Sequence, residues 1–297
     1  MYHLPVMLGP CLDALQIQPD GIYVDVTFGG GGHSKAILER LGPHGRLIGF
    51  DQDPDALSNA LDDPRFLLIE SNFRFLHKML RMEGIAEVDG ILADLGVSSH
   101  QLDEVSRGFT HRTNTTLDMR MSQAGKKDAA YVLNHYTEDE LVRIFSEYGE
   151  VRNSKTLARE IVASRSQRSF DSTEQLILIL ERVAMGEKHK YLSTVFQALR
   201  IEVNEEMETL AELLEASLKV LKSQGRLVVL TYHSLEDRLV KNFMKTGNTD
   251  GSLIQDDFGR IERPFKVLTK KPILPDPSES KANPRSRSAK LRIAEKN

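Results

Sequence analysis

The sequence has few of the residues that mark secreted, zinc-binding and membrane proteins. Its 297 residues include one cysteine, Cys11, and no tryptophan. A single cysteine cannot form an intramolecular disulfide, and no Cys/His cluster has the spacing of a zinc site. No apolar run approaches the roughly 20 residues of a membrane span, and the amino terminus lacks the pattern of a signal peptide. These absences predict a soluble, cytoplasmic protein with no metal, no covalent cysteine nucleophile and no membrane partner.

An overall basic charge is also missing, which argues against indiscriminate nucleic-acid binding. The formal net charge is −4. Residues 260–297 nevertheless hold eleven Lys or Arg against four acids, so this tail carries +7 and residues 1–259 carry −11. One basic face can therefore meet a polyanion while the rest of the surface stays acidic. The alternative interpretation is a basic tail that is simply solvated.

Four consecutive glycines lie at the centre of the first recognisable unit. An apolar, β-branched run over residues 22–28 leads into Gly29–Gly32, a helical pattern follows, and a second apolar run ends at Asp51. Backbone can approach a ligand closely at such a glycine turn because no Cβ intervenes. An acid at the end of the second strand is placed to accept hydrogen bonds from ribose hydroxyls. The unit predicts a site for a nucleoside-containing cofactor.

The remaining pattern predicts an α/β fold with a helical insertion. Strand and helix alternate four times up to residue 97, which is typical of an open, doubly wound parallel sheet. Residues 128–184 are helical in pattern, with capping-box spacing at Thr137 with Glu140 and at Ser172 with Gln175. We predict one domain from residues 1–104 and 193–297, the latter ending in a basic hairpin, and an inserted helical domain over residues 105–192.

Finer expectations concern the second part of the large domain. Residues 194–222 predict one long helix that ends near Gly225, with the glutamates of residues 202–215 on a solvated face. Strands are predicted over residues 226–233, 265–269 and 290–294. Ser234, with Asp237 three residues later, is predicted to cap the helix that follows the first of these strands.

The glycine corner admits three cofactor classes. A phosphate-binding P-loop needs a GK[ST] ending, but here the glycines continue into His33, Ser34 and a lysine, so that class does not fit. The dinucleotide fingerprint fits Gly29 and Gly31 but places Ser34 where a third glycine or alanine belongs. S-adenosylmethionine sites combine an acid in the first strand, a glycine turn and an acid ending the second strand, and the sequence supplies all three.

The end of the fourth predicted strand favours S-adenosylmethionine. Asp94 opens the stretch DLGVSSHQLD, which places an acid, a tight turn and hydroxyl side chains at the carboxyl edge of the sheet, where ligands of such sheets bind. Nothing marks a nicotinamide site. Asp94 and His233 are the candidate catalytic residues, each at the end of a predicted strand. Each also fits a structural role, Asp94 as a cap and His233 as a buried residue that fixes a turn.

Eight sequence blocks then resemble one known family. They occur in order across residues 24–292 and read VDVTFGGGGHS, GFDQDP, ADLGVSSHQLD, RGFTHRTNTTLDMRM, YGEVRN, FQALRIEVN, YHSLEDRLVK and NPRSRSAKLR. Together they resemble the bacterial ribosomal RNA small-subunit cytosine-N4 methyltransferase family (RsmH/MraW). The resemblance covers almost the whole chain.

This resemblance implies a Rossmann-like class I methyltransferase sheet with an inserted all-helical domain that helps to position RNA. It implies S-adenosyl-L-methionine as the cofactor and N4 of one cytidine in the decoding region of 16S rRNA, within the small ribosomal subunit, as the methyl acceptor. The implied cofactor-binding residues are Gly31, Gly32, His33, Asp51, Phe73, Asp94 and Gln101. An inactive S-adenosylmethionine-binding protein that recruits the ribosome or another partner remains an alternative, and the chain is either a monomer or a homodimer.

Methylation of a cytosine amine requires that the amine be positioned, that a group accept its proton and that the RNA be bound. The exocyclic amine of cytosine is a weak nucleophile because its lone pair is delocalised, so it has to be aligned and must lose a proton. The residues expected to hold RNA phosphates are Lys270, Lys271, Arg285, Arg287, Lys290 and Arg292. The chain departs from the family pattern at His100, Asn114–Thr116 and His189–Val195, which affects the expected RNA-facing loops.

Overall fold

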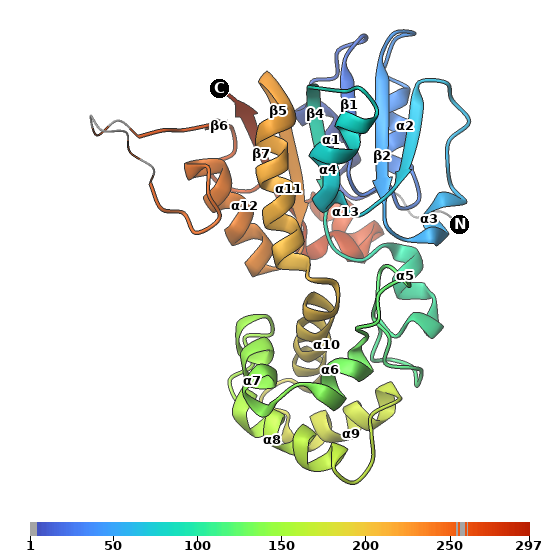
Figure 1. Cartoon of the computed structure of the whole chain (residues 1–297), viewed down its shortest axis with the longest axis vertical. Helices are drawn as coiled ribbons and strands as arrows, with labels where there is room; N and C mark the ends of the chain where they lie inside the picture. Colours follow the sequence, from blue (N-terminus) through green and yellow to red (C-terminus); the bar gives the residue numbers. More distant parts are fainter. Residues whose placement is uncertain (1–4, 254, 256–258, 260) are drawn as a thin grey trace. The chain divides into compact units, whose positions relative to one another are not determined.

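A computed structural model describes residues 5–253, 255, 259 and 261–297 (Figure 1). The chain forms two compact units, Met1–Gly96 with Met207–Asn297, and Val97–Glu206. We call them the sheet unit and the helical unit. The helical unit extends beyond the expected bounds of 105–192 at both ends, because Val97 and Val203 pack against its hydrophobic core.

The sheet unit is built on a seven-stranded sheet in the order β3-β2-β1-β4-β5-β7-β6 (Figure 1). Strands β1 to β5 are parallel to one another, and β7 runs antiparallel to both β5 and β6. The bounds are β1 Ile22–Asp25, β2 Arg46–Asp51, β3 Phe66–Glu70, β4 Val88–Asp94, β5 Leu221–Thr231, β6 Phe265–Val267 and β7 Lys290–Lys296. The expected parallel sheet is confirmed, and β6 and β7 form an antiparallel pair near the carboxyl terminus.

Both faces of this sheet are covered, because successive side chains of a strand point to opposite faces. Val24 and Ile48 belong to one hydrophobic core, whereas their neighbours Tyr23 and Leu47 belong to another. The helices of the sheet unit are α1 Leu8–Leu15, α2 Gly32–Leu38, α3 Pro54–Leu57, α4 Leu76–Met82, α11 Glu206–Val220, α12 Ser234–Thr246 and α13 Pro277–Ala282, with short 3-10 turns η1 Phe73–Phe75 and η3 Pro284–Ser288.

The helical unit contains α5 Ser99–Asp103, η2 Val105–Arg107, α6 Ala129–His135, α7 Glu138–Glu147, α8 Ser154–Arg165, α9 Thr173–Val183 and α10 Lys188–Asn204. The capping boxes expected at Thr137 and Ser172 are both present and begin α7 and α9. In the part of the chain that the structure describes, no helix combines the length and the apolar character needed to cross a membrane.

Three expectations for residues 194–234 are wrong. The single long helix is two helices, because Glu205 takes a left-handed backbone conformation (φ 50°) between α10 and α11. Gly225 does not end a helix, since β5 begins at Leu221 and carries an irregularity before its main ladder. The cap of α12 is His233 rather than Ser234.

Glu202 is the fourth correction, because it is buried and not on a solvated face. Its side chain is 10% exposed. One carboxylate oxygen accepts a hydrogen bond from the Tyr136 hydroxyl (2.6 Å), and the other accepts one from the Arg143 guanidinium (3.0 Å). Glu202 therefore ties α10 to the α6–α7 region and contributes to the architecture of the helical unit.

Candidate active site

The glycine corner links β1 to α2 and is held in shape by the acid that ends β2. Gly29 (φ 51°) and Gly31 (φ 73°) both adopt left-handed backbone conformations, which glycine reaches without steric cost. The Gly29 N–H donates to Asp51 Oδ2 (2.8 Å). A Cβ atom at Gly31 would lie 2.9 Å from the Phe28 ring. The turn is therefore fixed both by hydrogen bonding and by close packing.

Asp25, at the end of β1, accepts hydrogen bonds from residues of this turn. It is 1% exposed. Its Oδ2 accepts from the Ser34 hydroxyl (2.8 Å) and its Oδ1 from the Thr27 backbone N–H (3.1 Å). The Thr27 hydroxyl in turn accepts from the backbone N–H of Asp94 (2.7 Å). The first-strand acid thus stabilises the loop, and Thr27 ties that loop to the end of β4.

Asp51 is the second acid at this edge and is only half-buried. Its Oδ1 accepts from the backbone N–H of Asp53 (2.8 Å), and its Oδ2 accepts from Gly29. Burial raises the pKa of Asp51 to about 6, although these two N–H groups favour the charged form. Since a carboxylate offers about four acceptor positions, Asp51 can still accept hydrogen bonds from the hydroxyls of a ligand.

Asp94 is the third acid and ends β4. Its Oδ1 accepts a short hydrogen bond from the Tyr232 hydroxyl (2.6 Å), and its Oδ2 lies 3.8 Å from His33 Nδ1. The side chain is 23% exposed, so an incoming group can reach it. Burial is the largest effect on its pKa, which is raised. A carboxylate with a raised pKa is a stronger proton acceptor than an ordinary surface aspartate.

His33 is buried at the start of α2. Its Nε2 lies 3.1 Å from the backbone oxygen of Val6. A carbonyl oxygen can only accept, so Nε2 carries a proton and Nδ1 faces Asp94. Gly32, the first residue of α2, has no space for a side chain because Pro5 lies against it. The amino-terminal residues 5–6 therefore pack directly on the glycine corner.

The two remaining predicted cofactor residues are Phe73 and Gln101. Phe73 follows β3 in the turn η1, is half-buried and packs against the sheet core. Gln101 belongs to the helical unit, where its Oε1 accepts from the Ser98 backbone N–H (3.0 Å) in a capping box that begins α5. The structure thus gathers Gly31, Gly32, His33, Asp51 and Asp94 at the carboxyl edge of the sheet.

His233 serves as the cap of α12. Its Nδ1 accepts from the Glu236 backbone N–H (3.5 Å), and its Nε2 lies 3.0 Å from Glu236 Oε1. Glu236 also accepts from the backbone N–H of Tyr232 (2.9 Å) and of His233 (3.3 Å). The Nδ1 atom of His233 caps α12, which favours the structural interpretation over a catalytic one.

The six expected RNA-binding residues divide into two groups. Lys270, Lys271 and Arg287 are exposed, and Arg285 is half-buried. Arg292 instead is 5% exposed and forms two bonds to Asp237 (2.6 and 3.0 Å), while Lys290 Nζ lies 3.7 Å from the same carboxylate. Arg292 connects β7 to α12 and Lys290 faces the same carboxylate, so we leave both out of the RNA-binding set.

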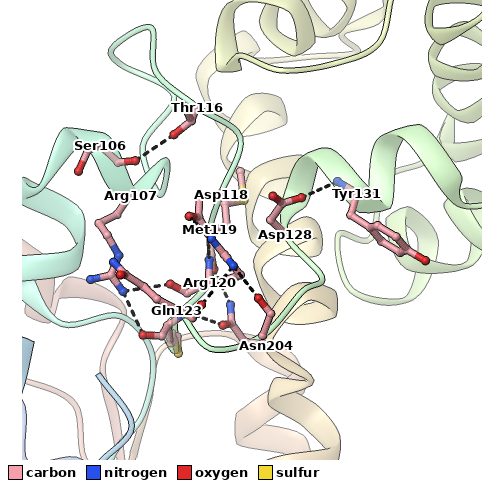
Figure 2. A network of polar contacts seen from close by, with 12 residues as sticks. Ser106, Arg107, Thr116, Asp118, Met119, Arg120, Gln123, Asp128, Tyr131 and Asn204 are labelled. Atoms are coloured by element: carbon pink, nitrogen blue, oxygen red, sulfur yellow. Dashed lines mark hydrogen bonds and ion pairs between the residues drawn. The ribbon is translucent and has the colours of Figure 1, made fainter. Parts of the chain in front are cut away.

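Part of the block RGFTHRTNTTLDMRM forms a polar network within the helical unit, and Figure 2 shows Arg107, Asp118 and Arg120 close to one another. Arg107 is 4% exposed and donates to the backbone oxygens of Arg120 and Met121 (both 3.0 Å). Asp118 pairs with Arg120 through two hydrogen bonds (2.7 and 2.8 Å). Met119 (φ 62°) is held between them. These charged side chains therefore organise a loop and do not project outward.

Two contacts escaped the sequence analysis. The Thr27 hydroxyl accepts a hydrogen bond from the backbone N–H of Asp94, and the Tyr232 hydroxyl donates one to the Asp94 carboxylate. Tyr232 carried a usable signal, since it lies at the end of a predicted strand next to the strand that ends at Asp94. Thr27 carried none, because a threonine within a β-branched run is expected on propensity alone.

The charge of this edge distinguishes between cofactor classes. Asp51 and Asp94 each have a pKa raised in part by repulsion from Asp25. An anionic diphosphate such as that of NAD would add repulsion, whereas a cationic ligand would relieve it. The edge therefore fits a positively charged nucleoside cofactor.

The strand order, with β7 antiparallel between β5 and β6, and the glycine corner followed by two strand-end acids define a Rossmann-like methyltransferase. A model described as "MraW methylase family" matches residues 1–297. The chain belongs to the MraW methylase family.

Curated relatives agree with this placement. A protein of Bacteroides fragilis named "Ribosomal RNA small subunit methyltransferase H" is 55% identical over 99% of this chain and 97% of its own. One of the same name from Flavobacterium psychrophilum is 56% identical over 98% of this chain and 100% of its own. A solved rRNA methylase from Streptococcus thermophilus covers 100% of this chain and 98% of its own, at 14% identity and a TM-score of 0.42. The family match and the curated relatives show that the chain is an enzyme of the methyltransferase class.

Proposed function

We propose that this enzyme transfers a methyl group from S-adenosylmethionine to the exocyclic N4 of a cytidine in the decoding region of 16S rRNA, within the small ribosomal subunit. The observation that carries this proposal is the 55% identity, over nearly the full length of both chains, to proteins named for methylation of small-subunit ribosomal RNA. Such a substrate places the enzyme in the cytoplasm.

The residues at the sheet edge fit the proposed cofactor. S-adenosylmethionine, when bound, supplies a methyl group activated by a positively charged sulfur. The acids of the edge complement that charge, and Asp51 keeps acceptor positions for ribose hydroxyls. Gly31 and Gly32 let Phe28 and Pro5 pack closely on the corner and so fix its shape, and Phe73 offers an apolar surface after β3. His33 contributes mainly by holding the start of α2.

Asp94 is the proposed proton acceptor. Its carboxylate can accept a hydrogen bond from the cytidine amine, which aligns the nitrogen, and then take the proton that the amine loses as the new N–C bond forms and the C–S bond breaks. Its raised pKa suits that task. His233 is not assigned a step, because its ring caps α12.

RNA binding is proposed to involve the helical unit and a basic surface made of Lys270, Lys271, Arg285 and Arg287. Exposed lysine and arginine side chains can bind RNA phosphates, and the affinity that they contribute depends on salt concentration. The target base has to leave its stack to reach a strand-end acid, as other base-modifying enzymes require. An inactive recruiting protein is not favoured, since the glycine corner, Asp51 and Asp94 are all present.

Mass mapping of rRNA tests the proposal. Small subunits that lack the modification are incubated with the enzyme and methyl-labelled cofactor, and the modified nucleotide is identified. A methyl group on any base other than cytosine N4 contradicts the assignment. Asp94→Ala is expected to abolish transfer while calorimetry still detects cofactor binding. Near-normal turnover by this variant would remove Asp94 from the mechanism.

A further inference from the structure

Tyr232 is held at three points beside Asp94. Its backbone N–H donates to Glu236 Oε2 (2.9 Å), and its hydroxyl donates to Asp94 Oδ1 (2.6 Å). A Cβ atom at Gly96 (φ 101°) would lie 3.5 Å from Cδ2 of the Tyr232 ring, so the ring packs on the turn that follows β4. The end of β5 is thus fastened to the end of β4 through one side chain.

These contacts leave the two oxygens of Asp94 in different states. Oδ1 is occupied by the phenol, at a distance typical of a strong bond to a charged acceptor. Oδ2 lies 3.8 Å from His33 Nδ1, too far for a hydrogen bond. In neutral His33 the proton is on Nε2, which faces the Val6 carbonyl, so Nδ1 has no proton to give Oδ2. Oδ2 is therefore the oxygen with capacity for a new donor.

We propose that Tyr232 is a positioning residue for methyl transfer, whose hydroxyl holds Asp94 so that Oδ2 is presented to the amino group of the substrate. The inference rests on the proposed function for its substrate, and on the geometry of the sheet unit for the Tyr232–Asp94 pair. Phenylalanine would preserve the packing on Gly96 but would leave the carboxylate free to rotate. The hydroxyl, and not the ring, carries the effect.

The pair also sets the pH at which Asp94 is charged. The groups that face this carboxylate are His33 of α2, Tyr232 after β5, Asp25 of β1, Glu236 of α12 and Cys11 of α1. Burial raises the pKa of Asp94, and the hydrogen bond from Tyr232 lowers it. Removing the hydroxyl therefore raises that pKa further. Asp94 acts in its charged form, so activity falls as the pH is lowered through its pKa. In a Tyr232→Phe variant this fall should begin at a higher pH than in the parent enzyme.

The kinetic test compares the full-length enzyme with Tyr232→Phe, using unmethylated small subunits and labelled cofactor from about pH 5 to pH 9. Loss of a hydrogen bond to a charged group predicts a kcat lower by about tenfold to hundredfold, with the cofactor Kd within about twofold of the parent. The acidic limb of the kcat profile is expected to move up by about one pH unit.

A matched control removes another buried phenol of the same unit. Tyr23 on β1 is 1% exposed, and its hydroxyl bonds to the backbone of residues 16 and 18 and not to Asp94. Tyr23→Phe is expected to lower stability without moving the pH profile of kcat. An equal shift in both variants would show a general structural effect and would overturn the positioning role.

A second measurement does not depend on the substrate. The carboxyl carbon of Asp94, assigned by comparison with Asp94→Asn, is titrated by NMR in the parent and in Tyr232→Phe. A titration that moves upward by about one unit in the variant supports the inference, and an unmoved titration overturns it. If the parent enzyme methylates a different target, the proposed function fails, while this titration still decides whether Tyr232 controls Asp94.

Discussion

Replacing Gly31 by alanine should destabilise the sheet unit far more than the same change at Gly84. Both glycines have left-handed backbone conformations, with φ of 73° and 71°. Their surroundings differ, because a Cβ at Gly31 would lie 2.9 Å from the ring of Phe28, whereas nothing lies within 4 Å of one at Gly84. The pair therefore separates the cost of the backbone conformation from the cost of the steric contact.

The magnitudes follow from the packing of Phe28. The backbone term is about 1–2 kcal/mol for each variant. At Gly31 a further term of about 1–3 kcal/mol is expected, since overpacking a closed site forces side chains from their preferred positions. Phe28 is 3% exposed and its ring centroid lies 5.3 Å from that of Phe66, so it has little room to retreat. The change in the unfolded chain is the same for both variants and cancels.

Urea unfolding followed by circular dichroism measures the difference, with equal m values as the check that one transition is compared. Gly31→Ala is expected to lose about 1–3 kcal/mol more than Gly84→Ala. Calorimetry should also show weaker S-adenosylmethionine binding for Gly31→Ala alone. Equal stability losses in the two variants would refute the close packing of Phe28 on the glycine corner.

Three further predictions concern charged residues. Because the pKa of Asp51 is raised to about 6, the folded protein holds a proton there that the unfolded chain has released, so stability should fall as pH rises from about 4 to 6, while affinity for the cationic cofactor should rise. Glu202→Ala should lower the unfolding free energy by about 1–2 kcal/mol, because the half-buried Tyr136 hydroxyl loses its acceptor while the Arg143 guanidinium, 41% exposed, can still be solvated. Replacing Lys270 and Lys271 together by alanine should weaken RNA binding and reduce the slope of log affinity against log salt by about 1.5.

Each of these has a matched control. Asp51→Asn should flatten the pH dependence of stability between about 4 and 6, and an unchanged dependence would assign it to another group. Glu215, which is exposed on α11, should change stability by less than about 0.5 kcal/mol when replaced by alanine. Arg292→Ala should lower stability through loss of its bonds to Asp237 and leave the salt slope unchanged. If Arg292→Ala reduced the salt slope as much as the double lysine variant, the structural role assigned to Arg292 would be wrong.

The parts of the fold that the sequence predicted are those with a local cause. The β-branched run before Gly29–Gly32, the capping boxes at Thr137 and Ser172 and the acid at the end of β4 each express their structure within a few residues. The sheet order was predictable only as a class, because it depends on pairings between β1 and β4 that no local pattern specifies.

The errors have non-local causes. Glu202 looked like its solvated neighbours, and its burial is set by Tyr136, which lies 66 residues away in the chain. Arg292 counted as one of several basic tail residues, yet its partner Asp237 lies on α12, 55 residues earlier. The alternation of apolar Leu291 and Ile293 with Arg292 would itself have predicted a solvent-facing arginine, so this error could be found only from its distant partner. The wrong predictions concern residues whose partners lie far away along the chain, whereas the correct ones concern residues whose partners are close in sequence.

The roles of the three acids at the sheet edge follow from how many of their acceptor positions the fold itself uses. Asp25 accepts from Ser34 and from both donors of Thr27 and is closed to solvent. Asp51 accepts one backbone N–H on each oxygen and keeps the other positions for ligand hydroxyls. Asp94 accepts on Oδ1 alone, within the described part of the chain, and its carboxylate is reachable from solvent. The capacity that remains therefore increases from the acid that shapes the loop, to the acid proposed to bind the cofactor, to the acid proposed to meet the substrate.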